Sequence, residues 1–200
     1  MLRRRLSHPH PLTSRLDRLR GRLASHHPRL DEQGDELIWA AVAVVLVPSP
    51  DAVLLIRRAE LAGDPWSGHM ALPGGRRGPE DPDLVATAVR ETAEEVGLAV
   101  LTEHLIGTLD DVVPRTPVLP PIAVRPYVFL LPERPALTLN REVAAARWVS
   151  LDLLLHPETY HSIRVEIRGE VRVMPAYSMG DAIVWGMTER VVTSLLAQIG

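Results

Sequence analysis

The longest apolar run in the chain, IWAAVAVVLV at residues 38 to 47, limits the folds that are open to it. These ten residues are only about half of what a helix needs to cross a bilayer, so a buried strand is the better interpretation. A second run rich in Val, Ile and Leu follows at residues 52 to 58, after the turn signal PSPD. Two buried strands joined by a turn predict a β-sheet at the centre of the fold.

The rest of the chain mixes strand and helix patterns. Further strands are expected near residues 104–109, 121–131 and 146–150. Arg168 and Gly169 should form the turn of a hairpin, and the apolar periodicity of DAIVWGMTERVVTSLLAQI indicates a final helix. We therefore expect an α/β fold, or an α+β fold with a mixed sheet, and a chain of 200 residues suits a single domain of this kind.

A segment rich in Arg and His precedes the first strand. Its composition suits a transit peptide or a phosphate-binding arm. A stripe at helical spacing favours instead an amphipathic helix docked on the domain or on a partner subunit: Leu12, Leu16, Leu19 and Leu23. We divide the chain into an N-terminal arm and helix, residues 1–30, and a domain, residues 31–200. A homodimer is one assembly that such a helix would allow.

Composition narrows the classes of function. The formal net charge is −3, whereas proteins that bind nucleic-acid backbones are usually basic, so we expect no nucleic-acid partner. The apolar runs are too short for a membrane span, so we expect no membrane partner either. The chain has no cysteine, which excludes disulfides, thiolate metal ligands and a cysteine nucleophile, and fits a cytoplasmic protein.

The segment DPDLVATAVRETAEEVGL, residues 81–98, has clear helix signals. Asp81 can serve as the N-cap, Pro82 suits the first helical position, and Gly97 suits a left-handed exit. On a helical wheel, a narrow stripe should pack against the sheet: Val85, Val89, Thr92 and Val96. The helix is therefore expected to begin after Asp81 and to end before Gly97.

Three glutamates crowd the end of this helix: Glu91, Glu94 and Glu95. Like charges at this spacing repel, and carboxylates are disfavoured near the C-terminal end of a helix. Arg90 lies one turn before Glu94 and can brace it. The adjacent glycines of PGGRR, residues 73–77, let the main chain approach a ligand closely. A solvated acidic face is one explanation, and a site for Mg²⁺ or Mn²⁺, which prefer oxygen ligands, is the other.

Residues 90–98, RETAEEVGL, resemble the latter half of the Nudix hydrolase signature, with Thr92 in place of an apolar residue. The front half departs from it, because Gly75 lies fifteen residues before Arg90 instead of fourteen, and the first Glu of the signature is either replaced by Asp81 or displaced to Glu80. A one-residue insertion in the loop explains the shift. The resemblance implies a mixed β-sheet sandwiched between helices and a metal-dependent hydrolase that cleaves a diphosphate linked to a nucleoside.

The same resemblance implies roles for individual residues. Glu91 and Glu95 would hold Mg²⁺ or Mn²⁺, and Glu94 would be a further ligand or the base that orients the attacking water. Arg90 would fix the glutamates, and a backbone carbonyl near Gly75 would complete the metal shell.

The substrate is expected beside the glycines, Gly74 and Gly75, where arginines could neutralise phosphate charge: Arg57, Arg58, Arg76 and Arg77. A role in surface solubility is the alternative for these four arginines. LPGGRRGPEDPDLVATAVRETAEEVGL and IVWGMTERV resemble the coenzyme A pyrophosphatase branch of the family, although Ile56 stands at a Thr position of that branch. Coenzyme A and its acyl esters therefore rank first as substrates. An ADP-ribose or dinucleotide pyrophosphatase, and a non-catalytic nucleotide-sensing module, are the alternatives.

Other residues invite functional interpretations outside the signature. A distal acid for base catalysis could come from Asp110, Asp111 or Glu142, although a capping or loop role is common for such residues. A nucleobase or pantetheine pocket could be lined by Trp66, His69 or Tyr177, although packing is the usual role of a loop aromatic. Trp148 precedes VSL in a predicted strand and is expected in the core.

Overall fold

The computed structural model describes residues 13–31, 36–60, 67–114, 121–167 and 169–200. A seven-stranded sheet has the strand order β3-β2-β1-β6-β5, with β4 paired to β1 and β7 paired to β2. Its strands are β1 (Ile38–Val47), β2 (Ala52–Arg58), β3 (Met70–Ala71), β4 (Gly74–Arg76), β5 (Leu105–Thr108), β6 (Ile122–Leu130) and β7 (Val143–Ser150). β1 and β6 run parallel and the other pairs antiparallel, so the sheet is mixed, as predicted.

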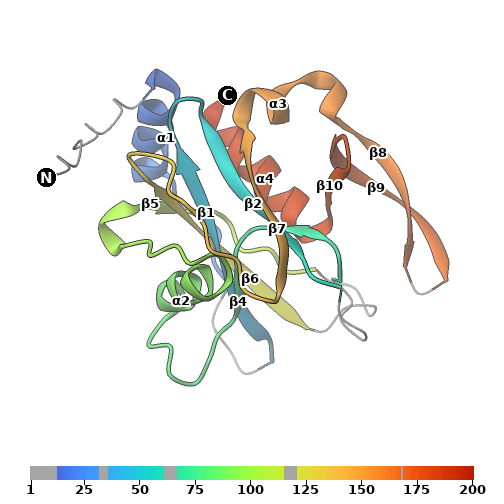
Figure 1. Cartoon of the computed structure of the whole chain (residues 1–200), viewed down its shortest axis with the longest axis horizontal. Helices are drawn as coiled ribbons and strands as arrows, with labels where there is room; N and C mark the ends of the chain where they lie inside the picture. The colour runs from blue at the N-terminus through green and yellow to red at the C-terminus, as the bar shows by residue number, and fades with distance from the viewer. Residues whose placement is uncertain (1–12, 32–35, 61–66, 115–120, 168) are drawn as a thin grey trace, which may run out of the picture.

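Helices cover both faces of this sheet (Figure 1). They are α1 (Ser14–Ser25), α2 (Leu84–Val96), α3 (Leu151–Leu155) and α4 (Gly186–Ile199). Side chains of α2 belong to the apolar core on one face, and those of α1 and α4 belong to the core on the other. The predicted sheet between helices, in a single domain with an extra N-terminal helix, is confirmed. In the described part of the chain, none of the helices has the length and apolar character that a membrane crossing requires.

The central position of β1 explains its uninterrupted apolar sequence. Ala41, Ala43 and Val45 face the core under α2, whereas Val44 and Leu46 face the core under α1 and α4. β1 lies between β2 and β6 in the sheet. A strand covered on both faces is apolar at every position instead of alternating, as is usual for buried parallel strands.

The N-terminal helix shares a core with the sheet. Its buried side chains come from the predicted stripe: Leu16, Leu19 and Leu23. Leu12, the fourth leucine of that stripe, lies outside the described residues. Thr13 caps the helix, and its hydroxyl also donates to the Asp51 carboxylate at 2.8 Å. Docking of this helix on the domain, one of the two predicted alternatives, is therefore observed, and the predicted boundary at residue 30 separates segments that share one core.

A second, three-stranded antiparallel sheet has the order β10-β9-β8. Its strands are β8 (Tyr160–Ile167), β9 (Glu170–Met179) and β10 (Ala182–Trp185). β8 and β9 form the predicted hairpin, which extends away from the central sheet in Figure 1. Arg168 of its turn lies outside the described residues, and Gly169 has a φ of 82°, which favours glycine. β10 leads directly into α4.

The start of α2 differs from the prediction. Asp83 is the N-cap, because its carboxylate accepts a hydrogen bond at 2.7 Å from the N–H of Ala86. Asp81 and Pro82 lie before the helix, so their predicted roles as N-cap and first helical residue are wrong. The predicted left-handed exit is confirmed, since Gly97 has a φ of 65°.

Packing also differs from prediction at a few positions. Val85 and Val89 pack against the core as predicted but are only half-buried, whereas Leu84, Ala88, Thr92 and Val96 are fully buried. Trp148 is half-buried instead of lying in the core, and the guanidinium of Arg134 lies 5.7 Å from its ring centroid. The Gly- and Pro-rich loop before α2 contains the short strands β3 and β4, which sequence patterns did not indicate.

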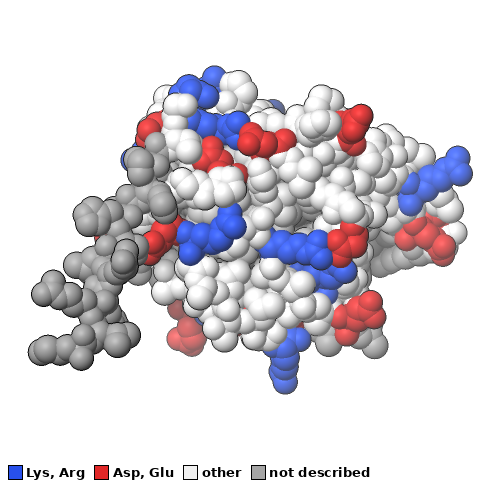
Figure 2. Space-filling model, turned by 45° about the horizontal axis from the view of Figure 1, so that its top comes forward, with Lys and Arg blue, Asp and Glu red and all other residues white. Residues whose placement is uncertain are grey.

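Surface charges of both signs are intermixed. Figure 2 shows Arg side chains beside Asp and Glu side chains on one face of the molecule. Ion pairs among the surface side chains include Arg147 with Asp181 at 2.7 Å and Arg172 with Glu170 at 2.9 Å. This mixing follows from the composition, in which 22 basic residues face 25 acidic ones.

Candidate active site

Strand pairing places the two adjacent glycines against the end of α2. In the antiparallel pair of β4 and β1, Gly75 lies opposite Ala41. The N–H of Gly74 donates to Oε2 of Glu95 at 2.9 Å. A Cβ atom at Gly75 would lie 2.4 Å from Cδ of Glu91, so only glycine leaves room for this carboxylate. The diglycine bend and the two carboxylates therefore form one site.

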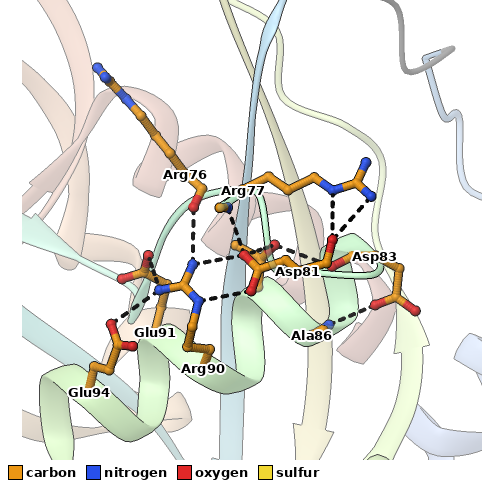
Figure 3. Close-up of polar contacts among 10 residues, drawn as sticks. Arg76, Arg77, Asp81, Asp83, Ala86, Arg90, Glu91 and Glu94 are labelled. Atoms are coloured by element: carbon orange, nitrogen blue, oxygen red, sulfur yellow. Dashed lines mark hydrogen bonds and ion pairs between the residues drawn. The ribbon is translucent and has the colours of Figure 1, made fainter.

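Arg90 links the loop before α2 to the glutamates (Figure 3). Its Nη1 donates to Oε1 of Glu91 at 2.9 Å and to Oε2 of Glu94 at 3.1 Å. Its Nη2 donates to the carbonyl oxygen of Arg76 at 3.2 Å. The bond to Glu94 is the one expected from their spacing of one helical turn. Arg90 thus orients two carboxylates and the end of β4 together.

Asp81 binds the other side of the Arg90 guanidinium. Nε and Nη2 of Arg90 donate to its two carboxylate oxygens at 2.9 and 2.8 Å, and the Gly78 N–H and the Thr87 hydroxyl donate to the same carboxylate. The hydrogen bonds from Arg90 hold the pKa of Asp81 well below its ordinary value. The same bonds raise the pKa of Arg90. The charge of Asp81 is therefore compensated within the chain.

The two glutamates beside the glycines, Glu91 and Glu95, have a raised pKa, in contrast to Asp81. Burial raises the pKa of Glu95 from 4.5 to about 7, and the carboxylates of Glu91 and Glu142 add to the rise. The Gly74 N–H opposes this rise without cancelling it. Burial also raises the pKa of Glu91, despite its bond to Arg90. The charge of Arg58 opposes the rise at Glu95, and both carboxylates still have a raised pKa, a condition that is frequent at functional sites.

A cavity of about 920 Å³ is lined by residues of the central sheet, the β8–β9 hairpin and the first turn of α4. Glu91 and Glu95 both line it. Glu142, one of the three candidate distal acids, lines the same cavity immediately before β7. The structure thus brings together three carboxylates that are up to 51 positions apart in the chain.

Glu94 does not share this environment. Its side chain is 55% exposed on the solvent side of α2, where it pairs with Arg90, and it is not among the residues that line the cavity. The three crowded glutamates therefore divide into Glu91 and Glu95 at the cavity and Glu94 outside it. A role for Glu94 as ligand or base stays a prediction.

Only some of the four candidate phosphate-binding arginines lie at the cavity. Two of them line the cavity: Arg58 and Arg76. Arg57 instead donates to the Asp181 carboxylate at 3.2 Å, in the turn between β9 and β10. Arg77 donates to the carbonyl oxygens of the loop before α2, including that of Asp81 (Figure 3). As placed, Arg57 and Arg77 connect parts of the fold and do not line the cavity.

The other two candidate distal acids are bound elsewhere. Asp110 accepts a hydrogen bond from Nε of Arg29 at 2.9 Å. Asp111 forms a buried ion pair with Arg125 at 2.8 Å. Neither aspartate lines the cavity, and both hold the segment after α1 against the central sheet.

Of the candidate ring residues that the structure describes, His69 lies at the cavity and Tyr177 does not. His69 lines the cavity, and its ring centroid lies 4.8 Å from that of Trp185 at the end of β10. Tyr177 is buried and shares a hydrogen bond of 2.8 Å with Thr193, so it packs between β9 and α4. Trp66 lies outside the described residues.

Sequence reasoning missed two parts of the site. Trp185 and the first turn of α4 form a wall of the cavity. The signal in the sequence is IVWGMTERV, which contains Trp185 and the first turn of α4 and resembles the coenzyme A pyrophosphatase branch. The second part is the bond of Asp81 to Arg90, and its signal was that Asp81 stands at the position of the first acid of the signature.

The donors at the cavity suit a hard divalent cation. Among the residues that the structure describes, no three His, Asp or Glu side chains are grouped as ligands of one metal ion. Mg²⁺, however, is often bound through one or two carboxylates together with substrate phosphates. Two buried carboxylates with a raised pKa, Glu91 and Glu95, provide an all-oxygen donor set that such an ion would neutralise. The contribution of a carbonyl near Gly75 stays a prediction.

Comparison with known proteins gives consistent matches. A family model described as NUDIX domain matches residues 38–167. An uncharacterized Nudix hydrolase NudL of Photorhabdus laumondii is 31% identical over 163 residues, which are 80% of this chain and 84% of that protein. NudL of Cronobacter sakazakii, also uncharacterized, is 31% identical over 192 residues, 95% of this chain and 96% of that protein.

Two further matches cover less of the other protein. An uncharacterized protein of Schizosaccharomyces pombe is 41% identical over 125 residues, which are 60% of this chain but only 38% of that protein. The crystal structure of a MutT/nudix family protein from Enterococcus faecalis has a TM-score of 0.56 at 16% identity, and the match covers 92% of this chain and 74% of that one. At this identity the structural likeness concerns the fold alone.

Proposed function

The chain belongs to the Nudix hydrolase family, and on this premise we propose that it is a metal-dependent pyrophosphohydrolase of coenzyme A or its acyl esters. The family membership makes it a hydrolase of phosphorus-containing anhydrides. The proposal adds the substrate and the residues that act on it.

One observation supports the catalytic assignment above the others. Glu95 is only 3% exposed, yet it borders the cavity. Among the described residues, its carboxylate accepts one hydrogen bond, from the N–H of Gly74. A buried carboxylate beside two other carboxylates is unfavourable unless a cation joins it. A structural role alone would not explain this arrangement.

Glu91 and Glu95 are the residues that we assign to the ion, Mg²⁺ or Mn²⁺, which Nudix hydrolases generally need. When bound, such an ion polarises phosphoryl oxygens and lowers the pKa of a bound water. Arg90 keeps Glu91 in position through its bond of 2.9 Å, and Asp81 keeps Arg90 in position in turn. Arg58 and Arg76 line the same cavity and can neutralise the charge of the diphosphate.

Glu142 is our preferred candidate for the base that receives a proton from the attacking water. It lines the cavity, and its charge contributes to the raised pKa of Glu91 and of Glu95. Proton transfer by a positioned side chain typically contributes about 10² to 10⁴-fold to a rate. Glu94 is the alternative base, and Glu142→Gln compared with Glu94→Gln distinguishes the two.

Coenzyme A is favoured because both segments that resemble the coenzyme A pyrophosphatase branch meet at one cavity. Gly74, Gly75 and Arg76 come from the first segment, and Trp185 and Met187 come from the second. ADP-ribose and dinucleotide cofactors rank next, and a non-catalytic nucleotide-sensing module ranks last because the carboxylates at the cavity are retained.

The test is a screen of diphosphate substrates with Mg²⁺ and Mn²⁺, with products identified by mass. Coenzyme A should give 3′,5′-adenosine bisphosphate and 4′-phosphopantetheine. Glu95→Gln and Glu91→Gln should each lower turnover by at least about 10³-fold, because each removes a charge that acts at the reacting group. The matched control is Glu80→Gln, an exposed residue in the loop before α2, which should keep full turnover.

Three results would count against the proposal. Retained turnover in both Glu91→Gln and Glu95→Gln would remove the metal assignment. Cleavage of ADP-ribose in preference to coenzyme A would move the substrate assignment to the alternative. Nucleotide binding without any hydrolysis would indicate the sensing module.

A further inference from the structure

A buried carboxylate of α4 lines the cavity that Glu91 and Glu95 also line, and the proposed reaction gives it no role. Glu189 lies in the first turn of this helix and is only 4% exposed. The other charged residues that α4 and the β8–β9 hairpin contribute to the lining are exposed: Glu166, Arg172 and Arg190. Burial of a charged group costs free energy unless hydrogen bonds or an opposite charge compensate it. The position of Glu189 therefore requires partners.

The chain provides partners for one of the two oxygens of Glu189. The hydroxyl of Tyr160 donates to Oε1 at 2.9 Å, and the hydroxyl of Thr193 donates to the same oxygen at 2.8 Å. The Tyr177 hydroxyl lies 2.8 Å from that of Thr193 and extends this network to β9. In the described part of the chain, Oε2 has no hydrogen-bond or ion-pair partner. A carboxylate can accept about four hydrogen bonds, so Glu189 is held in place and can still bind a ligand.

Glu189 and the carboxylates assigned to the metal ion stand on different helices. Side chains of α2 belong to the apolar core on one face of the central sheet, and those of α4 belong to the core on the other face. Residues of both helices nevertheless line the same cavity. A substrate whose diphosphate lies at Glu91 and Glu95 would therefore meet Glu189 with one of the two groups that the diphosphate joins.

The chemistry of a carboxylate indicates which group this is. An ionised carboxylate accepts hydrogen bonds and repels phosphate. In coenzyme A, the adenosine arm carries a 3′-phosphate, whereas the pantetheine arm is uncharged and has amide N–H groups and a hydroxyl that can donate.

We propose that Glu189 accepts a hydrogen bond from the pantetheine arm and thereby determines which way round the substrate binds. This inference rests on the proposed function and adds the orientation of the substrate to it. Glu189 is the specificity-determining residue. Tyr160 and Thr193 are positioning residues, because they act through the oxygen of Glu189 that they hold.

Calorimetry with the two expected products and Mg²⁺ tests this assignment, because each product contains one of the two arms. Glu189→Gln keeps the size of the side chain and removes its charge. The variant should bind 4′-phosphopantetheine at least about tenfold more weakly than wild type, since hydrogen bonds to charged groups are the stronger ones. Its affinity for 3′,5′-adenosine bisphosphate should change by no more than about threefold.

Two further variants make the result specific. Glu158→Gln is the matched control, because it makes the same change at an exposed residue two positions before Tyr160 and should bind both products as wild type does. Tyr160→Phe removes one of the two hydroxyls that hold Glu189. It should weaken the binding of 4′-phosphopantetheine by about threefold, even if circular dichroism shows that Glu189→Gln fails to fold.

Three results would overturn the inference. An equal loss of affinity for both products in a folded Glu189→Gln protein would indicate a purely structural role. Unchanged affinity for 4′-phosphopantetheine in Glu189→Gln would show that Glu189 does not contact this arm. A change confined to the bisphosphate would indicate the opposite orientation.

A failure of the proposed function would look different, since the wild-type protein would then cleave no diphosphate. Calorimetry still decides the inference in that case, because binding of the products requires no hydrolysis. Binding of 4′-phosphopantetheine that depends on Glu189 would support it. A wild-type protein that binds neither product would refute it.

Discussion

The loop before α2 and the cavity beside its last turns both contain a buried carboxylate, and the pKa values of these two groups are shifted in opposite directions. Asp81 receives hydrogen bonds from Arg90, Gly78 and Thr87, and its pKa is lowered. Glu95 receives one from Gly74, and its pKa is raised to about 7. The first carboxylate is neutralised by the chain that contains it. The second keeps its raised pKa although the charge of Arg58 opposes the rise.

Arg90 joins the two regions, since one guanidinium binds both Asp81 and Glu91. Its fixed, planar donors allow it to bind two carboxylates at once. A low pKa therefore marks a carboxylate that maintains the structure, whereas a raised pKa at a cavity marks one that is available to a ligand.

The largest expected effect is on stability, in the loop region. Asp81→Asn should lower the free energy of unfolding by about 3 kcal/mol, because it leaves a partly buried guanidinium without its strongest partner. Chemical denaturation measures this change. Asp83→Asn is the matched control, since Asn caps a helix about as well as Asp and should change stability by less than about 0.5 kcal/mol. Equal midpoints for Asp81→Asn and wild type would show that the chain does not depend on this compensation.

The second effect is a pH dependence of stability in the metal-free protein. The raised pKa of Glu95 means that its contribution to stability is complete below pH 4.5 and is lost as the pH rises through about 7. Asp81 behaves in the reverse sense, because its lowered pKa gives a contribution that is lost as the pH falls below the ordinary range.

Glu95→Gln removes the first of these titrations and leaves the second. In the presence of a chelator, the variant should gain about 2 kcal/mol over wild type between pH 5 and pH 8. Adding Mn²⁺ at pH 8 should stabilise wild type and have little effect on the variant, because only the wild-type site attracts the ion. A stability difference that stays constant over this pH range would contradict the raised pKa.

The smallest effect concerns the fit between the glycine bend and α2. Gly75→Ala should lower kcat/KM by about tenfold, because the added Cβ displaces the carboxylate of Glu91, while stability changes by less than about 1 kcal/mol. Gly21→Ala is the control, since nothing lies within 4 Å of a Cβ at Gly21 in α1. It should keep full activity and gain slight stability. Full activity in Gly75→Ala would show that Glu91 can move without consequence.

Much of the fold could be predicted because its signals are local. The apolar run of β1, the turn before β2 and the left-handed exit at Gly97 depend on neighbours within a few residues, and the structure confirms them. The N-cap of α2 is Asp83 and not Asp81 as predicted. Both are aspartates in front of the helix, and Asp is a preferred N-cap residue at either position, so the sequence alone does not distinguish them. An arginine nine positions further along the chain decided between them, since a charge-assisted pair is stronger than a cap hydrogen bond.

The sequence by itself determined that Glu91 and Glu95 lie one turn apart on a helix that follows two adjacent glycines, because helix periodicity and glycine geometry act locally. Only the tertiary structure decided which charged residues reach the cavity. Arg57 lies 124 positions before Asp181 and pairs with it outside the cavity, whereas Glu142 reaches the cavity 47 positions after Glu95. Strand pairing and hairpin placement determine such contacts between residues that are far apart in the chain. Propensities and spacings of neighbouring residues do not include the free energies of this pairing.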